Sequence, residues 1–143
     1  MGNLVSYFVE GVPVAQPRVK ARSFGKQARV YTPDTADMWK AAVKSLTRLK
    51  MGVSQGPYKL ALEFHLPRPK AHYRTGKNAH ILRDAAPGVH TQKPDVDNLA
   101  KAVIDAMVDS GRVDDDSYLT SLAVTKEWAK VHPGVFIYLE LVD

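Results

Sequence analysis

In the nine residues YKLALEFHL, Tyr58 to Leu66, large apolar side chains alternate with Lys59, Ala61, Glu63 and His65. Successive side chains of a β-strand point to opposite faces of a sheet, so Leu60, Leu62 and Phe64 are expected to face a core. No other segment of the chain constrains the fold as strongly, because this alternation fits a strand with one buried face and fits no helix.

Other segments are predicted from the same kinds of pattern. Strands are expected at residues 4–11, 118–128 and 135–142, and helices at residues 35–50 and 96–109. Thr35 or Asp34 is the expected cap of the first helix, and Gly111 is expected to stop the second. Their apolar sides are expected to be Met38, Ala41, Ala42, Leu46 and Leu49 in the first, and Leu99, Val103, Ala106 and Met107 in the second.

The order of these elements predicts an α+β or α/β fold in a single domain covering residues 1–143. The segment Pro13–Pro33 is expected to be a basic loop, with at most a short strand at ARVYT. The longer segment Pro67–Pro94 is expected to be irregular, and loops of that length in compact domains are usually functional or mobile. The first residues have no basic segment and no long apolar run, so neither a signal peptide nor a membrane span is expected.

Charge is divided unevenly along the chain. Residues 1–94 carry 16 Lys and Arg against 5 Asp and Glu, whereas residues 95–143 carry 4 against 10. The basic part is suited to neutralising phosphates, and the acidic part would repel them unless a cation lies between. A chain without cysteine has no disulfide, thiolate metal site or cysteine nucleophile. This division of charge favours an enzyme that binds a polyanion and uses a divalent metal.

Acidic residues gather around the second predicted helix, in KPDVDNLAKAVIDAM and in the following GRVDDDSY. Helical spacing places Asp97, Lys101 and Asp105 on one side, with Asp95 at the helix start. Hard oxygen ligands in close pairs suit Mg²⁺ or Mn²⁺. Each acid also has a simpler interpretation as a cap, a turn residue or a surface residue.

Two features limit what the acids alone establish. The helix is about 21 Å long, so acids at its start meet those before the next strand only if that strand returns along the helix. An EF-hand does not fit, because Ala100 and Ala106 stand where that loop needs Gly and Glu. The five histidines lack the spacing of a zinc site and are expected to be loop or surface residues.

PDVDNLAKAVIDAM, followed by DDDSYL and a strand that includes Lys126, resembles the RusA family of Holliday-junction resolvases. VEGVPVAQPR…RVYTP and AHYRTGK…APGVHTQKPDVDNL resemble its phage and prophage members, so the resemblance covers most of the chain. It implies a RusA-like fold, a mixed β-sheet packed with two main helices in two layers. It also implies a homodimeric endodeoxyribonuclease that cuts branched DNA, above all four-way junctions, by paired nicks.

The resemblance also implies roles for individual residues. The implied catalytic residues are Asp95, Asp97, Lys101 and Asp116, and the implied ligands of Mg²⁺, which Mn²⁺ could replace, are Asp95, Asp97, Asp115 and Asp116. A water activated by the metal would attack the phosphodiester, with the metal and Lys101 offsetting the developing charge. The residues expected to bind DNA are Arg18, Lys20, Arg22, Arg68, Lys70, Arg74, Lys77 and Lys126. The implied location is the bacterial cytoplasm, with the protein associated with the nucleoid or encoded by a phage.

Three other functions remain open at this point. A structure-selective flap or fork nuclease would use the same chemistry, and a non-catalytic DNA-binding module would use the basic segments alone. A glycosyltransferase would use Asp95 and Asp97 for a metal and a sugar diphosphate, but the chain lacks a Gly-rich phosphate loop.

Overall fold

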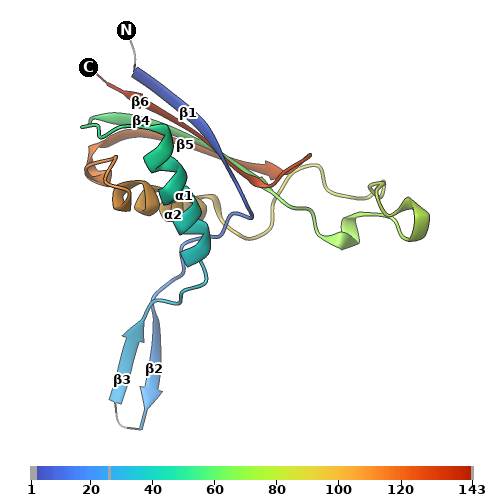
Figure 1. Cartoon of the computed structure of the whole chain (residues 1–143). Helices are drawn as coiled ribbons and strands as arrows, with labels where there is room; N and C mark the ends of the chain where they lie inside the picture. The colour runs from blue at the N-terminus through green and yellow to red at the C-terminus, as the bar shows by residue number, and fades with distance from the viewer. Residues whose placement is uncertain (1–2, 26, 143) are drawn as a thin grey trace.

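A four-stranded mixed sheet forms the centre of the computed structural model, which describes residues 3–25 and 27–142 (Figure 1). Its strand order is β1-β6-β4-β5, and all neighbours are antiparallel except β4 and β5, which are parallel. The strands are β1 (Asn3–Glu10), β4 (Tyr58–Leu66), β5 (Leu119–Trp128) and β6 (Gly134–Leu141). The alternation predicted for β4 is confirmed, since Leu60, Leu62 and Phe64 are buried.

Two helices, α1 (Asp37–Lys50) and α2 (Val96–Asp109), pack against each other and lie on one side of the sheet (Figure 1). The predicted α+β class, a mixed sheet with two main helices, is therefore confirmed. The cap predicted for α1 is wrong, because the helix begins after Ala36 and no side chain caps it. The largest fully buried side chains come from both layers and include Tyr58, Leu62, Phe64, Leu99, Met107 and Ile137.

The buried side of α1 also differs from the prediction. Trp39, Val43 and Thr47 are its buried residues, each one turn from the next. Met38 and Leu49, which were expected on the apolar side, are 90% and 76% exposed. The prediction for α2 is confirmed, because all four residues of its expected stripe are buried.

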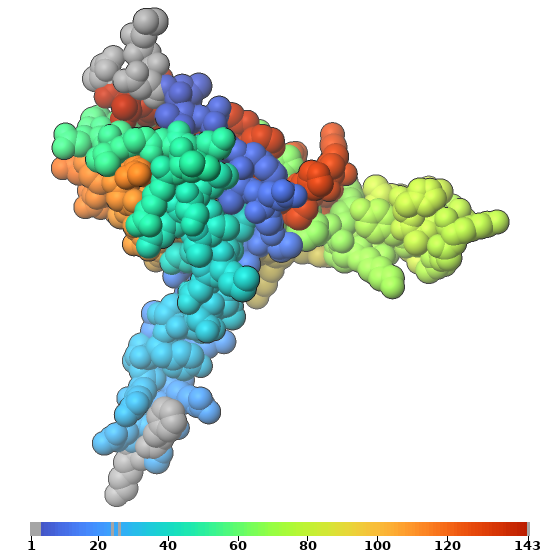
Figure 2. Space-filling view, in the orientation of Figure 1, coloured from blue at the N-terminus to red at the C-terminus, as the bar shows by residue number. Residues whose placement is uncertain are grey.

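The segment predicted as a basic loop is largely a β-hairpin. Strands β2 (Lys20–Phe24) and β3 (Gln27–Tyr31) pair only with each other, and every described side chain in them is exposed. Figure 2 shows this hairpin projecting far from the body of the protein. The prediction underestimated the regular structure, because a ribbon without a buried face shows no hydrophobic period.

The segment of residues 67–94 forms a second projection (Figure 2). It is irregular as predicted, apart from two short 3₁₀ turns at Lys70–His72 and Gly76–Asn78 and one bridge between Tyr73 and Leu82. A third 3₁₀ turn, Asp116–Tyr118, precedes β5. Within residues 3–25 and 27–142, no helix has the length and apolar character needed to cross a membrane.

Candidate active site

Strand β5 runs back along helix α2, so the acids that precede β5 lie close to the helix. Near the end of β5, the Lys126 ammonium donates a 2.9 Å hydrogen bond to the Pro94 carbonyl, just before α2 begins. Near the start of β5, the charge of Asp105 on α2 acts on the carboxyl of Asp116. The strand and the helix are therefore antiparallel neighbours.

A groove of about 520 Å³ lies between α2 and β5. The helix contributes one wall and β5, with the turn before it, contributes the other. The lining residues are Val96, Asp97, Ala100, Lys101, Ile104, Asp105, Asp116, Leu119, Leu122 and Val124. The groove thus has an apolar floor and carries three carboxylates and one ammonium, which is a setting that strengthens electrostatic interactions with a bound anion or cation.

The acids at the helix start, Asp95 and Asp97, are exposed. Asp95 occupies the N-cap position, but its side chain makes no capping hydrogen bond. Its carbonyl oxygen accepts the first helical bond from the Leu99 amide at 3.0 Å. The simple capping interpretation is therefore not supported, because the Asp95 carboxylate does not cap the helix.

The acids before β5 interact with each other. Asp115 accepts a 3.2 Å hydrogen bond from the Ser117 amide, and this bond, with one from Asp116, lowers the pKa of the Asp115 carboxyl. The hydrogen bond with Asp115 raises the pKa of Asp116, and the negative charges of Asp115 and Asp105 add to that effect. Carboxylates this close together repel each other when both are ionised. A divalent cation bound between them would offset that repulsion.

Asp114 has a structural role that the sequence did not indicate. Its carboxylate accepts hydrogen bonds from the Tyr58 hydroxyl at 2.8 Å and from the Asp115 amide at 3.1 Å. Burial raises the pKa of Tyr58, and the bond to Asp114 raises it further. Asp114 therefore fixes the turn to the start of β4, whereas Asp116 lines the groove.

The acids form two separate groups along the groove. Asp97 and Asp105 are eight residues apart on α2, which corresponds to about 12 Å along the helix axis. Among the described residues, no three histidine, aspartate or glutamate side chains come together as a metal-binding group. Asp105 lines the groove although the sequence favoured a surface role for it, and its spacing from Asp97 and Lys101 was the signal that could have identified it.

Lys126 acts on the segment that leads into α2. Its ammonium donates hydrogen bonds to the carbonyls of Gln92, at 2.5 Å, and Pro94, at 2.9 Å. These carbonyls lie immediately before Asp95, so Lys126 holds the chain that positions the helix-start acids. The side chain is half-buried, and two of its three donors are used within the protein.

Trp128 anchors the base of the long loop. The ring is buried and lies 4.1 Å from the ring of His90 and 4.9 Å from that of His72, and the Arg68 guanidinium lies 5.1 Å above it. Arg68 also donates a 2.8 Å bond to the Pro87 carbonyl. His90 lies in the loop, as one of the two predicted settings for the histidines, but it is only 6% exposed. Burial together with the charge of Lys126 lowers its pKa.

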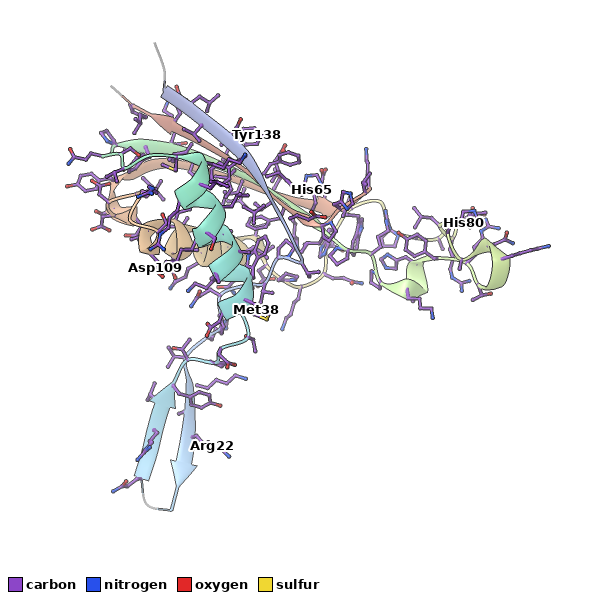
Figure 3. The ribbon with its side chains drawn as sticks, viewed as in Figure 1. Arg22, Met38, His65, His80, Asp109 and Tyr138 are labelled. Atoms are coloured by element: carbon purple, nitrogen blue, oxygen red, sulfur yellow. The ribbon has the colours of Figure 1, made fainter. Side chains whose placement is uncertain are left out.

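The other basic residues are spread over the two projections. Arg74 pairs with Asp84 at 3.2 Å. Arg22 on the hairpin and His80 on the long loop lie well away from the body of the protein (Figure 3). Of the residues predicted to bind DNA, Arg18, Lys20 and Arg22 are exposed on or beside the hairpin, and Lys70, Arg74 and Lys77 are exposed on the loop. Of the predicted catalytic and metal-binding residues, Asp97, Lys101 and Asp116 line the groove, whereas Asp95 and Asp115 do not. Most of the predicted DNA contacts lie on the two arms, and Lys126 lies on β5.

The chain matches a known protein family. The family described as Endodeoxyribonuclease RusA matches residues 10–140 of the 143-residue chain. No curated protein matches the chain. The matched region contains the groove and both projecting arms.

Proposed function

Because the chain belongs to the RusA family of Holliday-junction-resolving endodeoxyribonucleases, we propose that it is a magnesium-dependent homodimer that cuts four-way DNA junctions by paired symmetric nicks. The proposal treats residues 1–143 as a single RusA-like endonuclease domain. The observation that carries it is the groove in which Asp97, Lys101, Asp105 and Asp116 line an otherwise apolar cavity. The proposed place of action is the bacterial cytoplasm, at the nucleoid or on phage DNA.

The residues of the groove have separate roles in this proposal. Asp95, Asp97, Asp115 and Asp116 would hold Mg²⁺, or Mn²⁺ in its place, because carboxylate oxygens are the ligands that these ions prefer. A bound divalent ion supplies an activated water at neutral pH and neutralises charge on the phosphate.

Lys101 lies between the two groups of acids and would bind a non-bridging oxygen of the scissile phosphate. Its ammonium then stabilises the extra negative charge of the transition state. The apolar floor contributed by Ala100, Ile104 and Leu122 limits competing water around that charge.

A cleavage assay tests the proposal. Purified protein is incubated with a synthetic four-way junction, a linear duplex, a flap and a fork, each in Mg²⁺ and in EDTA. Paired nicks on the junction in Mg²⁺ alone are the expected result. Preferential cutting of the flap or fork would replace junction resolution with a related nuclease activity, and binding without cleavage in Mg²⁺ and Mn²⁺ would indicate a non-catalytic DNA-binding module.

The basic arms are expected to supply the salt-dependent part of DNA binding. Replacing both Lys70 and Lys77 by alanine should weaken junction binding and reduce the slope of log K against log [salt] by about 2, since each phosphate contact contributes about 0.9. Titrations at several salt concentrations measure the slope. Alanine at Lys44 and Lys50 on α1 is the matched control, and an equal loss there would place the DNA elsewhere.

Lys126 is expected to act by positioning the helix start and not by binding phosphate. The Lys126→Met variant should cleave about 10- to 100-fold more slowly, as is typical when a group supporting metal ligands is lost. Its salt slope should match that of the wild type. A slope reduced by about 1 with an unchanged cleavage rate would instead make Lys126 a phosphate contact. Lys130→Met, at an exposed lysine two residues beyond β5, is the control.

A further inference from the structure

The long loop has a defined shape although it has no core of its own. None of residues 67–89, all of which the structure describes, is buried. The two sides of the loop are joined by main-chain contacts, because the Arg74 amide donates a 2.8 Å hydrogen bond to the Ile81 carbonyl and a bridge pairs Tyr73 with Leu82. An ordered projection without buried apolar surface is typical of a binding element.

Two hollows lie against this ladder, and Tyr73 lines both of them. The outer hollow, of about 660 Å³, is formed by the loop alone, and the inner hollow, of about 420 Å³, lies between the loop and the end of β5. Both volumes fall within the range of ligand-binding pockets. Tyr73 is half-buried and its backbone is held by the bridge, so its side chain stands at a fixed place between the two hollows.

The outer hollow is basic. Lys70, Arg74 and Arg83 line it, and no acid is among its described lining residues. Arg74 pairs with Asp84 at 3.2 Å, but both side chains are largely exposed, and exposed ion pairs are weak. A phosphate can therefore replace Asp84 beside Arg74 at little cost.

The inner hollow connects the loop to the body of the protein. Arg68 and His80 line it from the loop, and Glu127 and Trp128 line it from β5. The Trp128 ring already contacts Arg68 and two histidines, so it anchors this hollow and offers no free stacking surface. The aromatic side chain that remains for a ligand is that of Tyr73.

The inner hollow also lies close to the start of α2. Trp128 is two residues beyond Lys126 on β5, which corresponds to about 7 Å along a strand. The Lys126 ammonium binds the Pro94 carbonyl, immediately before Asp95. A DNA strand with a phosphate at the helix-start acids can therefore continue past the end of β5 into the two hollows.

Basic hollows on both sides of an aromatic side chain match an unpaired strand better than a duplex. The faces of the bases in a duplex are stacked on one another, so only phosphates and groove edges reach a protein surface. An unpaired strand presents both its phosphates and its base faces, and base–aromatic stacking is the usual way in which proteins bind it. Strands of branched DNA can separate at the branch point, which brings such nucleotides near the catalytic groove.

We propose that the long loop binds unpaired nucleotides of a branched DNA strand, with a base stacked on Tyr73 and phosphates in the hollows on either side. The inference rests on the proposed function and names the part of the substrate that this loop binds. Lys70 and Arg83 bind phosphate in the outer hollow, and Arg68 binds phosphate in the inner one. The site is specific for unpaired DNA because only an unpaired base can reach the Tyr73 ring.

A binding titration with fluorescein-labelled oligothymidylate in EDTA tests the proposal without cleavage. Tyr73→Leu is expected to bind the oligothymidylate about 5- to 100-fold more weakly than the wild type, the range for losing one base–aromatic stack, and to bind a duplex of the same length normally. Tyr73→Phe keeps the ring and should bind both as the wild type does. Tyr31→Leu, at an exposed tyrosine of the basic hairpin, is the matched control and should keep its affinity for the oligothymidylate.

Three results of these titrations would overturn the proposal. Unchanged affinity of Tyr73→Leu for the oligothymidylate would show that no base stacks there. Equal losses for the oligothymidylate and the duplex would show that the loop binds phosphates alone. An equal loss of oligothymidylate affinity in Tyr31→Leu would remove the distinction between the two arms.

A crosslinking experiment on the wild-type protein does not depend on how the variants fold. An oligothymidylate containing 5-iodouracil reacts on irradiation with aromatic side chains against which the base is stacked. The crosslinked peptide is expected to contain Tyr73, and crosslinks confined to other peptides would overturn the site. Free dTMP should displace the oligothymidylate only at millimolar concentration, and displacement at micromolar concentration would make this a site for free nucleotides.

These measurements separate the inference from the proposed function. If the wild type cuts no branched DNA in Mg²⁺ but crosslinks at Tyr73, the proposed function is wrong and the strand-binding loop stands. If it cuts junctions and Tyr73→Leu binds oligothymidylate normally, the proposed function stands and the strand-binding loop is wrong.

Discussion

Cleavage by the Asp97→Asn variant is expected to fall by about 10³-fold or more, with junction binding retained. Asn keeps the size of the side chain and removes the negative charge that would hold a divalent cation. DNA affinity should not fall, because the change removes a charge that repels phosphate. Single-turnover cleavage in Mg²⁺ and a binding titration in Ca²⁺ or EDTA measure the two effects separately.

Asp109→Asn is the matched control for that prediction. Asp109 is an exposed acid at the last position of the same helix and does not line the groove. Wild-type cleavage is expected from it. Normal cleavage by Asp97→Asn would remove the helix-start acids from the catalytic centre, and equal losses in both variants would indicate a general effect of charge on α2.

Trp128→Ala is expected to lower the free energy of unfolding by about 3–5 kcal/mol, the range for truncating a buried large aromatic side chain. The ring is 6% exposed and contacts Arg68, His72 and His90 from the long loop. Its loss should also release the base of that loop. Urea denaturation measures the first effect, and limited proteolysis within residues 67–94 measures the second.

Trp39→Ala separates these two effects. Trp39 is also buried, at 5% exposed, but it lies on α1. Both variants should lose comparable stability, and only Trp128→Ala should accelerate cleavage of the long loop under native conditions. Equal protection of the loop in the two variants would mean that other contacts hold it in place.

The parts of the fold with one buried face were predictable from the sequence. The alternation in β4 and the apolar stripe of α2 indicate which face packs against the core, because the opposite, solvent-exposed face carries mostly polar residues. The stripe of α1 was misassigned because one of its members, Thr47, is polar. That residue is buried through a 2.7 Å hydrogen bond with Tyr7, a partner that no local pattern reveals.

The groove was only partly predictable. Spacing on a helix placed Asp97, Lys101 and Asp105 together, but the return of β5 along α2 depends on the parallel pairing of β4 and β5, which is long-range. The separate role of Asp114 among the three consecutive aspartates was not predictable either. Only its long-range hydrogen bond with Tyr58 distinguishes it from its neighbours. Arg68 and Lys126 also have partners inside the protein that residue type does not disclose.

The inward side chains of β5 carry out different tasks at successive positions. Leu122 and Val124 line the groove, Lys126 binds the carbonyls before α2, and Trp128 anchors the loop. A shift of one residue would turn all four to the opposite face of the sheet. During divergence of such a chain, insertions and deletions should therefore be eliminated within Leu119–Trp128 and accepted at the loop tip around Gly76. The register of β5 against β4 therefore determines where the chain of this enzyme can gain or lose residues without loss of activity.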